Sequence, residues 1–91
     1  MIEQGYGRVL SRPGLGARER ELITVAALAA LGWQRQLVSH VLGALRIGAS
    51  ESATHAALEL GASAADARGR GIARRTWRRA TRAAGVSAPR R

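Results

Sequence analysis

Apolar side chains in this sequence recur at intervals of three and four residues, and this spacing restricts the fold more than any other feature. The period is clearest at 22–30, 37–45 and 72–84. Residues three and four apart share one face of an α-helix, whereas a half-buried strand requires strict alternation. We find no strand pattern and no internal repeat in the sequence. The spacing therefore predicts an all-α fold.

Helix signals divide the chain into a small number of segments. We expect four helices, at 17–31, 33–47, 51–61 and 64–84. Glycines are expected to end the first three, at Gly32, Gly48 and Gly61. Ser50 is expected to cap the third helix, and Ser63 with Asp66 resembles a capping box for the fourth.

A chain of 91 residues is long enough for one small domain. We expect a single helical domain at 17–84, a glycine-rich N-terminal arm at 1–16 and a flexible C-terminal end at 85–91. The apolar side chains are small, with 19 Ala and no Phe. A small core of this kind is commonly supplemented by oligomerisation when disulfides and metals are missing.

The sequence contains no cysteine. Disulfides, cysteine-ligated zinc, iron–sulfur clusters and thiol nucleophiles are therefore excluded. His40 and His55 lie fifteen residues apart without further ligands in a metal-binding spacing, so no metal site is predicted. The sequence has no basic segment followed by an apolar run at its start and no apolar stretch long enough to cross a bilayer. We therefore expect a cytoplasmic protein with no membrane partner.

Positive charge is concentrated in the last quarter of the chain. The formal net charge is +9, yet residues 1–66 contain six Arg and six acidic residues, while 67–91 contain nine Arg and no acid. In the predicted last helix, five arginines oppose the apolar face: Arg74, Arg75, Arg78, Arg79 and Arg82.

The favoured interpretation of this arginine face is a helix surface exposed to solvent. The alternatives are a surface that binds nucleic acid or another polyanion, and a surface that contacts an acidic patch of a neighbouring subunit. Only three aromatic residues are available for stacking on bases, and no helix-turn-helix spacing is present. The sequence therefore favours the solvated face and keeps polyanion binding as an alternative.

Three segments together point to a known family. They are Gly-Tyr-Gly-Arg-Val-Leu-Ser-Arg-Pro-Gly-Leu at 5–15, Arg-Glu-Arg-Glu-Leu-Ile-Thr-Val-Ala-Ala-Leu at 18–28, and His-Val-Leu-Gly-Ala-Leu-Arg-Ile-Gly at 40–48. In this order and spacing, the chain resembles the carboxymuconolactone decarboxylase family, which includes the AhpD-like alkylhydroperoxidases. The resemblance implies a small helical bundle built on an antiparallel helix pair and assembled into homo-trimers or hexamers.

The peroxidase branch of that family uses the pattern E-x11-C-x2-C-x3-H. Counted from Glu21, the pattern falls on Trp33, Gln36 and His40. The acid and the histidine are present, but both cysteines are replaced. Because thiol peroxidase chemistry requires a thiolate, this reaction is excluded.

The decarboxylase branch needs neither a thiol nor a cofactor. The resemblance implies that a carboxy-lyase of this kind removes CO2 from 4-carboxymuconolactone to give an enol-lactone. Such a reaction needs a general acid to protonate carbon, and cationic groups to hold carboxylates. His40 is the candidate acid, and Glu21 would orient it. The candidate substrate-binding residues are Arg12, Arg20, Arg46 and Trp33.

Each of these residues also has a purely structural interpretation. His40 could be a packed helical histidine, Glu21 could complement the helix dipole, and Trp33 could anchor a core or an interface. A catalytically silent family member is therefore an alternative to the enzyme, alongside a basic helical module that binds a polyanion.

Overall fold

The computed structural model describes residues 15–85, and within that range its regular structure is entirely helical. The helices are α2 (Ala17–Leu31), α3 (Gln34–Arg46), α4 (Glu51–Ala62) and α5 (Ala67–Ala83). The all-α prediction is confirmed for this part of the chain. Residues 1–14 of the expected arm and 86–91 of the expected C-terminal end lie outside the described residues.

Two of the predicted helix ends are formed as expected. Gly32 adopts a left-handed conformation with φ of 72°, and its backbone N–H reaches the carbonyls of Leu28 and Ala29. Glycine adopts this conformation without the steric cost that a Cβ imposes. At the start of α4, the Ser50 hydroxyl accepts a hydrogen bond from the Ala53 N–H at 3.0 Å. Local sequence chemistry therefore sets both boundaries.

The predicted start of the last helix is wrong by three residues. Asp66, not Ser63, is the N-cap of α5, and its carboxylate accepts a hydrogen bond from the Gly69 N–H at 2.9 Å. The Ser63 hydroxyl instead donates to the Leu60 carbonyl. Residues 63–66 form the turn between α4 and α5, because their backbone and side-chain donors satisfy the last carbonyls of α4.

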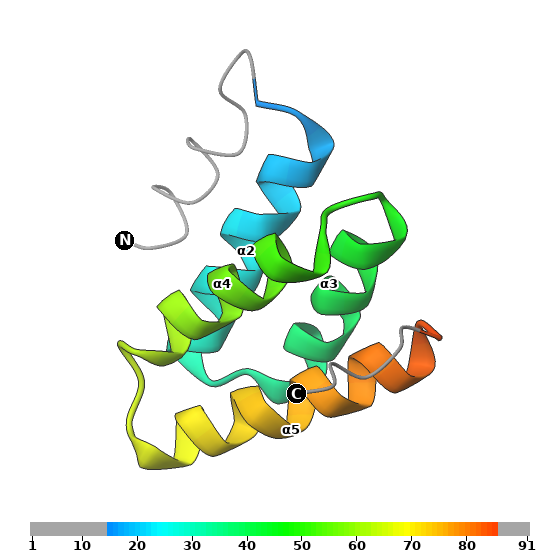
Figure 1. Ribbon diagram of the computed structural model, residues 1–91. Helices are drawn as coiled ribbons and strands as arrows, with labels where there is room; N and C mark the ends of the chain where they lie inside the picture. Colours follow the sequence, from blue (N-terminus) through cyan, green and yellow to red (C-terminus); the bar gives the residue numbers. More distant parts are fainter. Residues whose placement is uncertain (1–14, 86–91) are drawn as a thin grey trace.

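Helix α2 is covered by two neighbours, as Figure 1 shows. The short connection after α2 sends α3 back antiparallel to it, and α4 lies along another side of α2. Helix α5 crosses this group at one end and packs mainly against α3. The largest fully buried apolar side chains come from α2, α3 and α4: Val25, Leu37, Val41 and Leu58.

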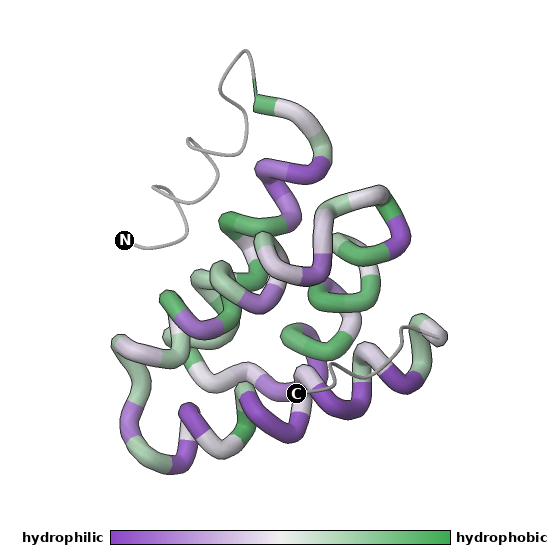
Figure 2. Tube along the Cα trace, in the orientation of Figure 1, coloured by the Kyte–Doolittle hydropathy of each residue, from purple (hydrophilic) through white to green (hydrophobic). Residues whose placement is uncertain are grey.

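Helix α5 separates charge from apolar surface more sharply than the other helices. Ile72, Ala73 and Ala80 are buried against the core, together with Thr76. Figure 2 shows hydrophilic stretches alternating with apolar ones along this helix. All five arginines of the predicted cationic face are exposed to solvent. The expected two-faced character of this helix is confirmed.

Gly61 does not end α4, contrary to the expectation from sequence. It lies inside the helix without a positive φ, and it is buried against α2. A Cβ built at Gly61 would overlap the carbonyl oxygen of Ala26 and lie 2.8 Å from the Ala29 Cβ. The absence of a side chain therefore allows the backbones of α2 and α4 to touch.

We predict that Gly61→Ala destabilises the domain by about 3 kcal/mol, at the upper end of overpacking costs, because one of the clashing atoms belongs to the backbone. Urea unfolding followed by circular dichroism measures this change. The matched control is Gly71→Ala, where the new Cβ meets only the flexible ends of two side chains, the Arg75 Nη1 at 3.3 Å and the Arg74 Nη2 at 3.9 Å. Alanine should stabilise that helix position by about 1 kcal/mol. Equal midpoints for the two variants would contradict the close approach.

Candidate functional site

A polar contact joins α2 to α3 near the middle of their antiparallel pair. The Nδ1 atom of His40 lies 2.9 Å from the Oε1 atom of Glu21. Glu21 occupies the second turn of α2, and His40 lies at the centre of α3. Their side chains are 28% and 39% exposed respectively, so the pair is open to solvent on one side. The structure thus brings together the two residues that the sequence selected as candidate catalytic groups.

Gly43 helps α3 to approach the carboxylate. It follows His40 by about one helical turn, and a Cβ built there would lie 3.4 Å from the Glu21 Oε1 atom. A larger side chain at this position would press on the acid. The glycine in the His-x-x-Gly segment therefore lies directly beside the Glu21–His40 pair.

The chemistry of the pair assigns a proton position on the imidazole. An ionised carboxylate only accepts hydrogen bonds, so the His40 Nδ1–H must donate to Glu21. In the neutral ring, Nε2 then carries the lone pair. In the charged ring, Nε2–H is the donor left for a substrate, and the carboxylate stabilises the positive charge.

Among the residues that it describes, the structure does not connect the predicted carboxylate-binding residues Arg20 and Arg46 with the Glu21–His40 pair. Arg20 is exposed and donates a hydrogen bond to the Leu15 carbonyl at 3.3 Å. Arg46 ends α3, six residues beyond His40, and is also exposed. Within residues 15–85, no hydrogen bond or ion pair links either arginine to the Glu21–His40 pair. Arg12 lies outside the described residues.

Trp33 stands at the N-cap of α3 and is 52% exposed, which excludes a role in the core. His40 follows it by seven residues, and Ile47 follows His40 by seven more. This spacing is nearly two helical turns and places all three on one face. Ile47 is also exposed, at 44%. The half-open histidine therefore lies between two exposed large apolar side chains.

The arginines of α5 are solvated, and within the described range the ion pairs are His40–Glu21 and His55–Glu59. None of the five arginines of the predicted cationic face therefore forms an ion pair with a carboxylate of the described residues. These arginines face two neighbouring helices. Arg74 and Arg78, four residues apart, lie on the side of α5 next to α4, whereas Arg79 borders α3.

Sequence reasoning missed one cluster. The His55 ring lies 4.7 Å from that of Trp77, and its Nε2 lies 3.4 Å from the Glu59 Oε2. The spacing of four between His55 and Glu59 is visible in the sequence. The contact with Trp77 is not, because it joins α4 to α5 through tertiary packing.

No group of three or more His, Asp or Glu side chains is arranged to hold a metal ion in the part of the chain that the structure describes. Within the same part, no helix is both long enough and apolar enough to cross a membrane.

Comparison with known families decides the relationship that the motifs suggested. Residues 1–86 match the profile of the carboxymuconolactone decarboxylase family. The chain belongs to this family. The match extends beyond the motifs at 5–48 to include α4 and α5, so the arginine-rich helix is part of the family domain. No curated protein and no solved structure gives a significant match.

We predict that the neutral His40 ring of this carboxymuconolactone decarboxylase family member carries its proton on Nδ1. Nitrogen chemical shifts of the imidazole, measured by NMR, distinguish this form from the Nε2–H form. Glu21→Ala should abolish the preference, because it removes the acceptor. Glu19→Ala, two residues earlier on α2, is the control and should leave the shifts unchanged. A proton on Nε2 in the unmodified protein would contradict the assigned contact.

Proposed function

We propose that this protein catalyses the cofactor-free decarboxylation of a small lactone carboxylic acid of the 4-carboxymuconolactone type. The observation that carries the proposal is the 2.9 Å contact between Glu21 and His40, which couples a carboxylate to the one candidate general acid in the family motif. Family membership supports a carboxymuconolactone-decarboxylase-like protein in general terms. The reaction and the residue roles below are our proposal.

In the proposed reaction, the bond between the ring carbon and the carboxylate breaks and CO2 leaves. The electron pair remains on the unsaturated lactone as a delocalised enolate. The His40 imidazolium then donates its Nε2 proton to carbon, which yields the enol-lactone. Glu21 accepts the hydrogen bond from Nδ1 and stabilises the imidazolium before the transfer. One proton is consumed for each CO2 released, and His40 regains it from solvent after the product has left the site.

The substrate carboxylates require cationic partners, and arginine binds them with two parallel hydrogen bonds. Arg20 is the nearest candidate along the chain, since it precedes Glu21 on α2 and its side chain is exposed. Arg46 and Arg12 are further candidates. Trp33 is proposed to contact the lactone ring or a neighbouring subunit, because it extends from the face of α3 that carries His40.

We propose that the site is completed in a homo-trimer or hexamer. The Glu21–His40 pair is partly open to water, and proton transfer to an enolate benefits from a site that excludes water. Three large apolar side chains are exposed at the ends of the same two helices: Leu31 at the end of α2, and Trp33 and Ile47 at the two ends of α3. A second copy packed on this face would bury the apolar surface and cover the pair together.

Light scattering of the purified protein should give the mass of a trimer or hexamer at both low and high salt. Ile47→Glu should reduce that mass, because it places a charge in the proposed interface. Leu60→Glu is the matched control, since Leu60 is an exposed leucine on α4. A monomeric unmodified protein would exclude the proposed subunit-covered site.

Turnover of 4-carboxymuconolactone tests the chemistry. His40→Gln should lower kcat by about 10²–10⁴-fold, the usual contribution of a general acid. Glu21→Gln should lower it less, because the neutral amide still accepts the Nδ1 hydrogen bond but no longer stabilises the charged ring. Glu19→Gln is the control on the same helix and should keep full activity. An intact oligomer without turnover would instead identify a catalytically silent member.

A further inference from the structure

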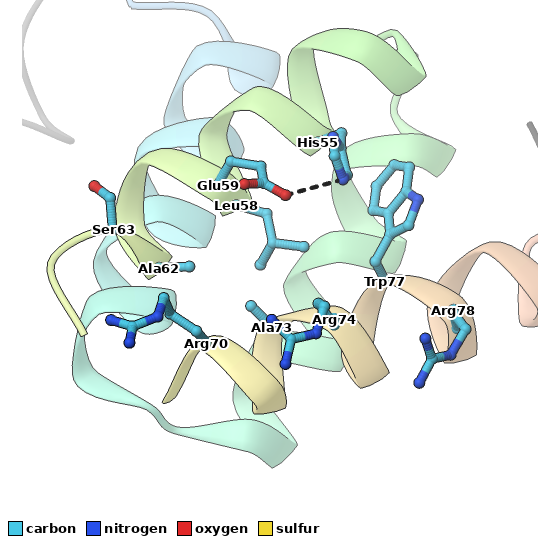
Figure 3. A pocket seen from close by; sticks show the side chains of 10 residues that line it. All are labelled: His55, Leu58, Glu59, Ala62, Ser63, Arg70, Ala73, Arg74, Trp77 and Arg78. Atoms are coloured by element: carbon cyan, nitrogen blue, oxygen red, sulfur yellow. Dashed lines mark ion pairs between the residues drawn. The ribbon is translucent and has the colours of Figure 1, made fainter. Parts of the chain in front are cut away.

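A hollow lies between α4 and α5, and it shares no residue with the Glu21–His40 pair. Its volume is about 320 Å³, which is within the range of small-molecule sites. Figure 3 shows its side chains: His55 and Glu59 extend from α4, while Trp77 and the arginines extend from α5. No function proposed above uses this hollow.

Three kinds of surface meet in the hollow. Leu58, Ala62 and Ala73 line it with buried apolar groups. His55 and Trp77 form an aromatic wall, with ring centroids 4.7 Å apart and planes inclined by 59°. Aromatic rings in this tilted arrangement can accommodate a further planar group beside them. The apolar and aromatic surfaces together suit a flat ring.

The third surface is cationic and lies on the α5 side. Arg70, Arg74 and Arg78 follow one another at intervals of four residues, so they lie along one side of the helix and all border the hollow. The Arg70 Nη1 atom donates to the Ala65 carbonyl at 2.9 Å, which holds this guanidinium at the turn between the helices. Its other N–H groups remain available as donors.

Charge in the hollow is strongly one-sided. Its single acid, Glu59, lies 3.4 Å from His55 on the α4 side, away from the row of arginines. An anion is therefore attracted toward α5 and repelled from α4. A ligand with a ring at one end and negative charge at the other has a defined orientation here.

We propose that this hollow binds a small planar aromatic anion, that is, an aromatic ring bearing a carboxylate or a phosphate. The ring lies on the apolar lining against Trp77, and the anionic group binds the row of arginines that borders the hollow, with Arg74 at its centre and Arg70 and Arg78 on either side. The apolar lining distinguishes this site from general attraction of polyanions to α5, because a phosphate backbone would leave that lining uncovered.

An NMR titration at 0.15 M salt tests the proposal. The chain has two tryptophans, so two indole N–H signals are expected, and Trp33→Phe identifies the one from Trp77. Naphthoate and AMP serve as probes of a ring carboxylate and a ring phosphate. Either probe should shift the Trp77 signal until the site is saturated, and should leave the Trp33 signal unchanged. The relative affinities of naphthoate and AMP show whether the site prefers a carboxylate or a phosphate. Cyclohexane carboxylate, which lacks the aromatic face, should bind more weakly.

Two double variants that lose the same charge distinguish binding in the hollow from general electrostatic attraction to α5. Arg74→Gln/Arg78→Gln should weaken binding by about tenfold or more, because it removes charge-assisted hydrogen bonds at the hollow. Arg75→Gln/Arg82→Gln removes two charges from exposed α5 positions that do not line the hollow and should change affinity less than about twofold, as expected for screened charges.

Equal weakening by both pairs would overturn the proposal and would indicate general polyanion attraction to the helix. A Trp77 signal that no aromatic anion shifts would also overturn it. Circular dichroism of both variants confirms that the helices are intact. The result is independent of 4-carboxymuconolactone turnover, so this proposal and the proposed function succeed or fail separately.

Discussion

The close packing of α2 against both α3 and α4 is the constraint on which the rest of the structure depends. Gly61 allows the α4 backbone to touch α2 at Ala26, and the turn at Gly32 returns α3 along another side of the same helix. Half of the buried apolar residues are alanines, so the core gains packing from the close approach of backbones as well as from its Val, Leu and Ile side chains. This same packing fixes the separation across which Glu21 and His40 meet.

Charge is distributed in two distinct ways over this frame. Over residues 1–66, arginines and acidic residues are equal in number, and a carboxylate of α2 is paired with a histidine of α3. On α5, arginines lie on the outer surface with little acid around them. The first arrangement suits proton transfer at a single position. The second suits anion binding, and where an apolar hollow adjoins it, the anion can be a small aromatic one.

Much of the candidate site could be predicted from residue spacing. The pairing of Glu21 with His40 was predicted from the resemblance to the family pattern, and the two helices that carry these residues were predictable from their apolar period. Trp33 could not be placed, because a tryptophan after a glycine turn is equally consistent with burial and with exposure. The environment of His55 was missed for a related reason, since its neighbour Trp77 lies 22 residues later in the sequence, on α5.

The sequence by itself determined the all-α fold, the exclusion of thiol chemistry, the concentration of arginine in the last helix and the end of α2 at Gly32, because each depends on local composition or on contacts within one or two turns. Only the tertiary structure decided that Gly61 is a contact point and not a helix end, and that a hollow lies between α4 and α5. These features depend on how separate helices approach one another. A pattern of apolar spacing states which face of a helix is covered, but not which residues of another helix cover it.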